Sequence, residues 1–481
     1  MEVKLLGTQE RWQEDLFVAG PLSSLIPDDH ILKQVDKVLD LSWLRRDVSE
    51  LYCHTNGRPG IDPEAAVRLM LAGFFQGIVH DRKLIREAQV NLAIRWFAGY
   101  RLDEKLPDHS SLTRIRQRWG AERFKQIFLK TVQSCIDANL VNGETVHVDA
   151  TLIRADVSWE SLTTEHAETV IKENASDEDT PKGRGGRPKK QPKPKKRSTT
   201  DPDATMTTSS HTHRMEPFYK QHGAVDDRCG VVVDVDVTTG QDNEGRQLPD
   251  QIERIEATTG MEIQTVSADA GYAHGKNYEH LEKKQIDAVI PPQKENSTPK
   301  RLPIRLFKYD AKHKIVTCPG GKTLTRRTED KKGWVYRSSA KDCRRCKLRK
   351  RCLSEAVKSR SVLIGHGYEA LLRARRRHRE PDKKFRQTYS RHRWKIEGMH
   401  GEAKTQHGLR RAVRRGLSNV AIQAYLTAAV INLKRLVTYA DGLFDDLRGY
   451  WMDILTNVAN RIAVRAILIN RTKKRIWKMA G

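Results

Sequence analysis

The chain has 481 residues, enough for two to four domains, and its formal net charge of +26 gives a pI near 9.8. Such an excess of positive charge opposes compaction unless a polyanion neutralises it, so nucleic acid is the expected partner and a basic membrane-surface protein is the alternative. We find no signal peptide and no apolar run of about 18 residues, because polar side chains interrupt the longest candidate, residues 420–437. We therefore expect a cytoplasmic, nucleoid-associated protein with no membrane span. The odd number of cysteines, seven, disfavours a secreted disulfide framework.

Residues 1–140 have the periodicity of a helical domain. Helices are expected to begin at Pro63 after the N-cap Asp62, at Asp81, at residues 108–110, and at Ala121 after a stop at Gly120. The third of these helices carries Arg114 and Arg116. Short helices with a basic last member favour a helix-turn-helix-like module in which these arginines contact DNA. The alternative is a plain helical bundle whose arginines face solvent.

The character of the sequence changes at Glu144. The segment TVHVDATL alternates apolar and polar residues, which predicts a strand with Asp149 in its middle. A carboxylate buried on a strand is costly unless it is paired or binds a cation, so Asp149 is a candidate ligand. The alternative is an aspartate that faces solvent or lies next to a turn.

Residues 156–216 are polar and have little apolar periodicity. Within them, residues 181–197 contain nine basic residues and no acidic one, so we expect disorder in the free protein. Gly186-Arg187-Pro188 with its flanking lysines resembles the core of an AT-hook, which lays an arginine in the minor groove. We expect Arg187 to make nonspecific phosphate contacts first and to read the minor groove second.

An α/β order follows the basic segment. The pattern predicts strands at 231–237, 263–268 and 288–292 and a helix at 248–258. Asp269 directly follows the second of these strands and is followed by Gly271. Its carboxylate is therefore expected at the C-terminal edge of a strand, beside a tight loop.

Four of the seven cysteines lie in an insertion spanning residues 295–380. Cys318 stands in a T-C-P-G-G turn, and Cys343, Cys346 and Cys352 follow with the spacing C-x2-C-x5-C. Four thiolates can fold a small ribbon around zinc, and the alternative is a set of reduced thiols without metal. The arginines around this cluster are dense enough to form a phosphate-binding surface.

The segment YSRHRWKIEGMHGEAK, residues 389–404, places a carboxylate among bases at helical spacing. At about 100° per residue, Arg393, Glu397 and Lys404 fall within roughly 40° of one another, while Glu402 points to the opposite face. Glu397 is either part of a solvated salt-bridge ladder or a metal ligand beside phosphate-binding bases.

The chain then continues with further bases and helices. Arg410 and Arg411 lie in the basic run GLRRAVRRGL, and Ser418 is expected to cap a helix reaching about Val437. Residues 441–481 have the pattern of a helical tail, to which the sequence assigns no role.

Together these residues resemble the DDE transposases of bacterial insertion sequences. In one large group of that family the third motif reads Tyr, two residues, Arg, three residues, Glu, six residues, Lys. Arg393, Glu397 and Lys404 keep the Arg-Glu-Lys intervals, and Tyr389 stands one place early but faces the same way on a helix. Further likeness lies in HVDATLIRAD, ADAGYAHG, the helical segment LPDHSSLTRIRQR and the late cysteines. The resemblance extends from about residue 10 to 440.

The resemblance implies an α/β ribonuclease-H-like catalytic core in which Asp149, Asp269 and Glu397 bind two Mg²⁺ ions, or Mn²⁺ in their place. Arg393 and Lys404 would hold DNA phosphates. The implied activity is Mg²⁺-dependent cleavage at element ends followed by strand transfer. The implied partners are double-stranded DNA, both terminal inverted repeats and target, and a second copy of the chain in a homodimer.

The expected domains follow from these assignments. They are a helical DNA-binding domain (1–140), the first part of the core (144–294, with a disordered basic insertion at about 156–216), the cysteine-rich insertion (295–380), the last part of the core (381–440) and the tail (441–481). Two rival functions remain open from the sequence. One is a catalytically degenerate DNA-binding regulator, and the other is a plain nuclease on the same fold.

Overall fold

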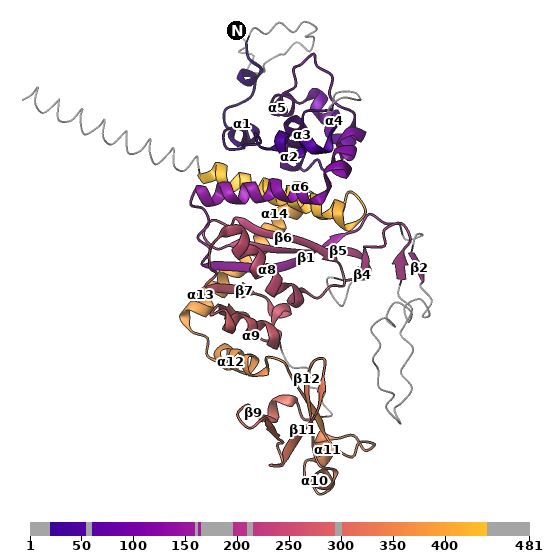
Figure 1. The fold of residues 1–481 in the computed structure, drawn as a ribbon, viewed down its shortest axis with the longest axis vertical. Helices are drawn as coiled ribbons and strands as arrows, with labels where there is room; N and C mark the ends of the chain where they lie inside the picture. The colour runs from indigo at the N-terminus through magenta and orange to yellow at the C-terminus, as the bar shows by residue number, and fades with distance from the viewer. Residues whose placement is uncertain are drawn as a thin grey trace, which may run out of the picture.

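The structure, a computed structural model, describes residues 20–53, 60–158, 162–164, 196–208, 215–293 and 301–439. Arg187, the basic segment around it and the predicted helical tail from residue 441 lie outside the described residues. Figure 1 shows a helical domain at one end, a mixed sheet with its helices in the middle, and a smaller sheet at the other end.

Residues 20–140 form the helical domain that the sequence predicts. Its helices are α1 (Ile31–Asp36), α2 (Leu44–Val48), α3 (Pro63–Phe75), α4 (Asp81–Val90), α5 (Leu92–Phe97) and α6 (His109–Asp137). The carboxylate of Asp62 accepts hydrogen bonds from the amides of Glu64 and Ala65, which confirms the predicted cap of α3. Gly120, with φ 70° and ψ 175°, breaks the helical geometry inside α6. The two helices predicted on either side of this glycine are therefore the halves of one kinked helix.

A six-stranded mixed sheet forms the centre of the molecule. Its strands are β1 (Thr145–Arg154), β4 (Thr205–Thr207), β5 (Glu216–Asp226), β6 (Val232–Thr239), β7 (Thr265–Ala268) and β8 (Asp287–Val289). The order is β4-β5-β1-β7-β8, and β6 also pairs with β5. The pairs β1–β5 and β5–β6 are antiparallel, whereas β1–β7 and β7–β8 are parallel. The helices α8 (Glu244–Thr259) and α9 (Gly275–Lys283) lead into β7 and β8, as parallel neighbours require.

Part of the segment 156–216 is ordered, which corrects the prediction of a wholly disordered insertion. Strand β2 (Leu162–Thr164) pairs with β3 (Lys196–Ser198), and β4 joins the central sheet. Asp201 is buried and accepts a hydrogen bond from the hydroxyl of Tyr219 at 2.5 Å. Strands of three residues leave no periodic pattern, so the sequence carried no signal for them.

The cysteine-containing insertion has a sheet and a hydrophobic core of its own. Its strands, in the order β13-β12-β11-β10-β9, are β9 (Lys308–Asp310), β10 (Ile315–Thr317), β11 (Thr323–Asp330), β12 (Gly333–Arg337) and β13 (Ser361–Gly365). Two short helices, α10 (Ala340–Arg344) and α11 (Arg349–Cys352), lie between β12 and β13 in the chain. Phe307, Val316 and Tyr336 are among the residues of the separate core. The insertion is therefore a small domain, larger than the ribbon that the cysteine spacing predicted.

The chain returns to the central sheet through a series of helices. They are α12 (Tyr368–Arg379), α13 (Lys383–His392), the π-helical turn η6 (Arg393–Glu397), α14 (Gly398–Thr405) and the helix Leu417–Tyr439. The last of these lies along α6 (Figure 1). The side-chain amide of Asn432, fully buried, bonds the backbone N and O of Val232 at 2.8 and 2.9 Å and donates to Thr131 Oγ1 at 3.3 Å. One satisfied polar group thus joins this helix to both β6 and α6.

The helix Leu417–Tyr439 is also, within the described part of the chain, the one element long and apolar enough to cross a membrane by length and composition alone. In the folded chain 83% of its most apolar window is buried. Burial of this kind is typical of a core helix, so its composition is explained by its contacts with α6 and β6.

Candidate active site

The three predicted acidic residues come from three different elements. Asp149 lies on β1, whose parallel register with β7 pairs Val148 with Ala268. Asp149 is the next residue on β1 and Asp269 directly follows β7, so the two lie beside each other at the carboxyl end of β7, with Asp149 in the middle of the longer β1. Asp269 then caps the short 3-10 helix η4 (Ala270–Tyr272) by accepting a hydrogen bond from the Gly271 amide at 2.7 Å. Glu397 ends the π turn η6, which packs against β1 and β5.

Asp149 has an environment that disfavours its charge. Burial raises its pKa to about 7, against a smaller lowering by the backbone amide of Ala150. The negative charges of Asp269, Glu244 and Glu397 raise it further. The negative charges of several carboxylates thus act on Asp149, an arrangement that a bound cation would stabilise.

Two tyrosines face the same acidic cluster. The hydroxyl of Tyr272 is buried and has no hydrogen-bond partner within the described part of the chain. Its pKa is raised well above the usual value by burial and then by Asp149, Glu244 and Asp269. The pKa of Tyr389 is raised by burial and then by Asp269, Glu397 and Asp149.

Basic side chains flank the cluster on the late helices. Arg393 Nε lies 3.3 Å from Glu397 Oε2, and the side chain of Arg393 is 83% exposed. Lys404 has a pKa lowered by burial and by Arg410, while Asp149 acts in the opposite direction. Arg393 and Lys404 therefore lie on the side of the helix that faces the acids, with the exposed Arg393 paired to Glu397.

His400 lies beside Asp149 and was not singled out as a site residue from the sequence. Its Nε2 is 3.9 Å from Asp149 Oδ2, and burial lowers its pKa to about 3. Neither ring nitrogen has a hydrogen-bond partner among the described residues. Its position three residues after Glu397 on a helix was the signal that could have identified it.

Glu402 points away from the site, as the helical spacing predicts. Its carboxylate bonds the guanidinium of Arg435 at 2.7 Å and also pairs with Lys434, both on the helix Leu417–Tyr439. Burial would raise its pKa, but His407 and these bases hold it well below the usual range. Glu402 therefore fastens α14 to the helix behind it.

The prediction that Arg116 contacts DNA is wrong. Arg116 is only 3% exposed, and its guanidinium makes two hydrogen bonds to Asp81 at 2.7 and 2.9 Å. Asp81 also pairs with Arg414, so this buried cluster joins the helical domain to the C-terminal part of the core. Arg116 shares its helix face with the buried Trp119, whereas Arg114 is exposed and stays a candidate DNA contact.

Arg410 and Arg411 lie beside the C-terminal end of β1. The backbone amide of Arg154 donates a hydrogen bond to the Arg410 carbonyl at 3.2 Å. The side chains of Arg410 and Arg411 are both exposed. Arg411 also pairs with Asp156 at 2.6 Å. Their place next to the strand that carries Asp149 fits phosphate binding near the site.

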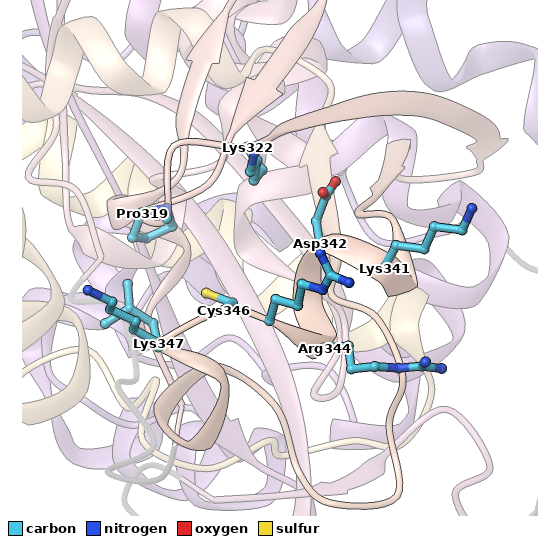
Figure 2. Close-up of a pocket in the computed structure, with 10 residues that line it drawn as sticks. Pro319, Lys322, Lys341, Asp342, Arg344, Cys346 and Lys347 are labelled. Atoms are coloured by element: carbon cyan, nitrogen blue, oxygen red, sulfur yellow. The ribbon is translucent and has the colours of Figure 1, made fainter.

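The four late cysteines approach one another at one end of the small domain. A Cβ atom built on Gly320 would lie 3.2 Å from Cys346 Sγ and 3.7 Å from Cys318 Sγ. Burial raises the pKa of Cys352, and the other three thiols raise it further, although Arg360 lowers it. Figure 2 shows Cys346 among the basic side chains of a pocket that Lys322, Lys341 and Arg344 also line.

Both sets of residues have donors that suit metal ions. Carboxylate oxygens are the ligands of Mg²⁺ and Mn²⁺, and thiolates are ligands of Zn²⁺. In the ranges that the structure describes, no group of three or more His, Cys, Asp or Glu side chains is already arranged around a metal-sized space. The carboxylate of Glu397 is turned towards Arg393 instead, with its side chain 60% exposed. Loading the site would therefore include a reorientation of that side chain.

Two family descriptions match the chain. Residues 21–118 match the family described as "Transposase domain (DUF772)", and residues 317–437 match the family described as "Transposase DDE domain". The second range includes Glu397, whereas Asp149 and Asp269 lie between the two ranges. No curated protein matches the chain.

Solved transposase structures are more distant. The piggyBac transposase synaptic complex with hairpin DNA is 9% identical and has a TM-score of 0.31, with coverage of 87% of this chain and 74% of that chain. The Mos1 transposase paired-end complex with left transposon end is 10% identical and has a TM-score of 0.16, with coverage of 51% and 65%. Because these scores are low, the functional conclusion depends on the two family matches.

The buried Arg116 and the exposed Arg114 provide a matched test of their roles. Arg116→Ala is expected to lower the free energy of unfolding by about 3–5 kcal/mol, because Asp81 loses a buried partner. Arg114→Ala should leave stability within about 0.5 kcal/mol of wild type. Urea unfolding followed by circular dichroism measures both. Equal stability of the two variants would show that the Asp81 cluster is not a structural link.

Proposed function

The chain belongs to the DDE transposases, enzymes that cleave DNA strands and transfer them, and we propose that Asp149, Asp269 and Glu397 carry this activity as ligands of two divalent cations. The observation that carries the proposal is the parallel β1–β7 register, which puts Asp149 beside Asp269 at the carboxyl end of β7. Glu397 contributes to the same acidic environment, since it raises the pKa of Asp149 together with burial and two other carboxylates.

The strand arrangement supports a ribonuclease-H-like core. The antiparallel strands β6, β5 and β1 are followed across the sheet by the parallel strands β7 and β8. This is the α/β order in which the family's acids meet at neighbouring strand ends. Helix α13 is fixed to the same sheet, because Arg391 Nε and His147 Nε2 both bond Asp227 Oδ1, at 3.0 and 2.9 Å.

The carboxylate oxygens of Asp149, Asp269 and Glu397 favour a hard divalent cation, which is Mg²⁺ or, in its place, Mn²⁺. When bound, such ions neutralise the charge on the attacking and leaving oxygens of an in-line phosphodiester displacement. The chain's own contribution is to hold three carboxylates on rigid elements. The packing around Asp149 leaves its side chain only 21% exposed, which limits the access of water to its carboxylate.

Basic residues around the cluster would bind the DNA backbone. Arg393 and Lys404 are next to the acids, and Arg410 and Arg411 extend the basic surface along the end of β1. Charge-assisted contacts of this kind position DNA without reading its sequence. Arg114 on the helical domain would add a more distant contact, and Arg187, outside the described residues, would add phosphate or minor-groove contacts.

We also propose that two copies of the chain act together on the nucleoid. An element has two terminal inverted repeats, and both must be cut and joined to one target. A homodimer bound to double-stranded DNA would bring the two ends together.

Replacement of a proposed ligand should abolish cleavage without unfolding the protein. Asp149→Asn and Glu397→Gln are expected to reduce Mg²⁺-dependent cutting of a plasmid carrying the coding region and its flanking DNA by at least about 100-fold, because charge stabilisation in the transition state is lost. Glu402→Gln is the matched control. It should lower thermal stability, because Lys434 and Arg435 lose their partner, but retain cutting per folded molecule.

The same assay separates the rival functions. A second plasmid as target should receive the cut ends, whereas a plain nuclease would cut and never join. Persistent cutting by Asp149→Asn, or equal loss of cutting in Glu397→Gln and Glu402→Gln, would contradict the assignment.

The cysteine cluster supports a second proposal, that Cys318, Cys343, Cys346 and Cys352 bind one structural Zn²⁺. The thiols come from the turn after β10, which carries Cys318, and from the segment of α10 and α11, which carries the other three. A bound Zn²⁺ ion would link these cysteine-bearing segments in a domain that has only a small hydrophobic core of its own.

Elemental analysis of the purified chain tests this proposal. About one zinc per chain is expected in wild type. Cys343→Ser should lose it, while Cys229→Ser, which changes a thiol in the turn between β5 and β6, should retain it. Equal zinc content in the wild type and Cys343→Ser would refute the proposal.

A further inference from the structure

A fourth carboxylate, that of Glu244, lies beside the three predicted acids. Glu244 is the first residue of α8, and the sequence analysis did not single it out. A Cβ atom built on Gly271 would lie 2.8 Å from Asp269 Oδ1 and 3.0 Å from Glu244 Oε2. Both oxygens therefore flank the same glycine, which leaves room for them to approach.

The backbone around Glu244 holds it in this position. The buried side-chain amide of Asn277 donates to the carbonyl of Gly245 at 2.7 Å and to that of Tyr272 at 2.9 Å. These bonds tie the start of α8 to the loop that carries Asp269. A Cβ atom on Gly245 would come within 2.5 Å of the His274 ring, so the close approach of the two segments requires glycine there.

An independent observation points to a ligand in the same place. The hydroxyl of Tyr272 is buried among Asp149, Glu244 and Asp269 and has no hydrogen-bond partner in the described part of the chain. An unsatisfied polar group beside three like charges is unfavourable in the protein alone. A hydrated cation would satisfy both the hydroxyl and the carboxylates.

The alternative role for Glu244 is an ordinary ion pair at a helix start. Its Oε1 lies 2.9 Å from Lys220 Nζ, and a negative charge at the first helical position is favourable. This role accounts for Oε1 but not for Oε2, which lies beside Gly271 together with Asp269 Oδ1. Lys220 Nζ also donates to the Asp242 carbonyl at 2.8 Å, so Lys220 has a backbone partner besides Glu244.

We propose that Glu244 is a further ligand of the divalent cation held by Asp149 and Asp269. The inference rests on the proposed function, because it adds a carboxylate to the same metal site. The occupant is a hard divalent cation, for which a further oxygen donor raises affinity.

Mn²⁺ binding to the full chain without DNA, followed by the electron paramagnetic resonance signal of free Mn²⁺, tests the proposal. Glu244→Gln is expected to weaken binding about tenfold or more. Glu253→Gln is the matched control, because Glu253 is an exposed glutamate on the same helix, and it should bind as wild type. Glu244→Asp, which keeps the charge, should bind more tightly than Glu244→Gln.

Lys220→Gln distinguishes a ligand from an ion-pair partner. If Glu244 is a ligand, loss of the competing ammonium should leave Mn²⁺ binding unchanged or tighter. Equal weakening in Lys220→Gln and Glu244→Gln would overturn the proposal. Thermal midpoints in EDTA identify any variant that fails to fold, and Glu244→Asp then replaces Glu244→Gln in the comparison.

Asp269→Asn separates failure of this inference from failure of the proposed function. Weak binding by Asp269→Asn with wild-type binding by Glu244→Gln would overturn the role of Glu244 and leave the three-acid site intact. Wild-type binding by both variants would overturn the metal site itself.

Discussion

The parallel pairing of β1 with β7 is the constraint on which the rest of the structure depends. It places Asp149 beside Asp269 at the carboxyl end of β7, with Asp149 buried deeply enough to raise its pKa to about 7. Buried like charges of this kind are destabilising unless a cation compensates them. The surrounding elements must therefore supply the stability that the site removes.

The late helices carry one acid on the face towards the site and another on the opposite face, where it stabilises the fold. Glu397 lies on the face towards the sheet, while Glu402 on the other face pairs with Lys434 and Arg435. The π turn η6 lies between Tyr389 and Glu397 and contains about one residue more than an α-helical turn. This extra residue fits the position of Tyr389, which stands one place early relative to the family motif. Tyr389 still faces the acids, since they raise its pKa together with burial.

Much of this arrangement was predictable from local patterns, and the rest depends on contacts between distant segments. Alternation located β1, and helical spacing separated Glu397 from Glu402. The same spacing could have shown that Arg116 lies on the apolar face with Trp119, two positions from Arg114. Glu244 had no such signal, because only the tertiary approach of α8 to the Asp269 loop makes it part of the cluster. Two of the five strands of the small domain, β9 and β10, are only three residues long, which is too short to leave a periodic pattern.

Thermal unfolding at pH 8 in EDTA and in Mg²⁺ tests the central claim most directly. In EDTA, Asp149→Asn should unfold at a higher temperature than wild type, because one buried charge is removed. Mg²⁺ should raise the midpoint of wild type by several degrees through preferential binding to the folded state, and should change that of Asp149→Asn far less. A wild-type midpoint that Mg²⁺ leaves unchanged, together with a less stable Asp149→Asn in EDTA, would contradict the account.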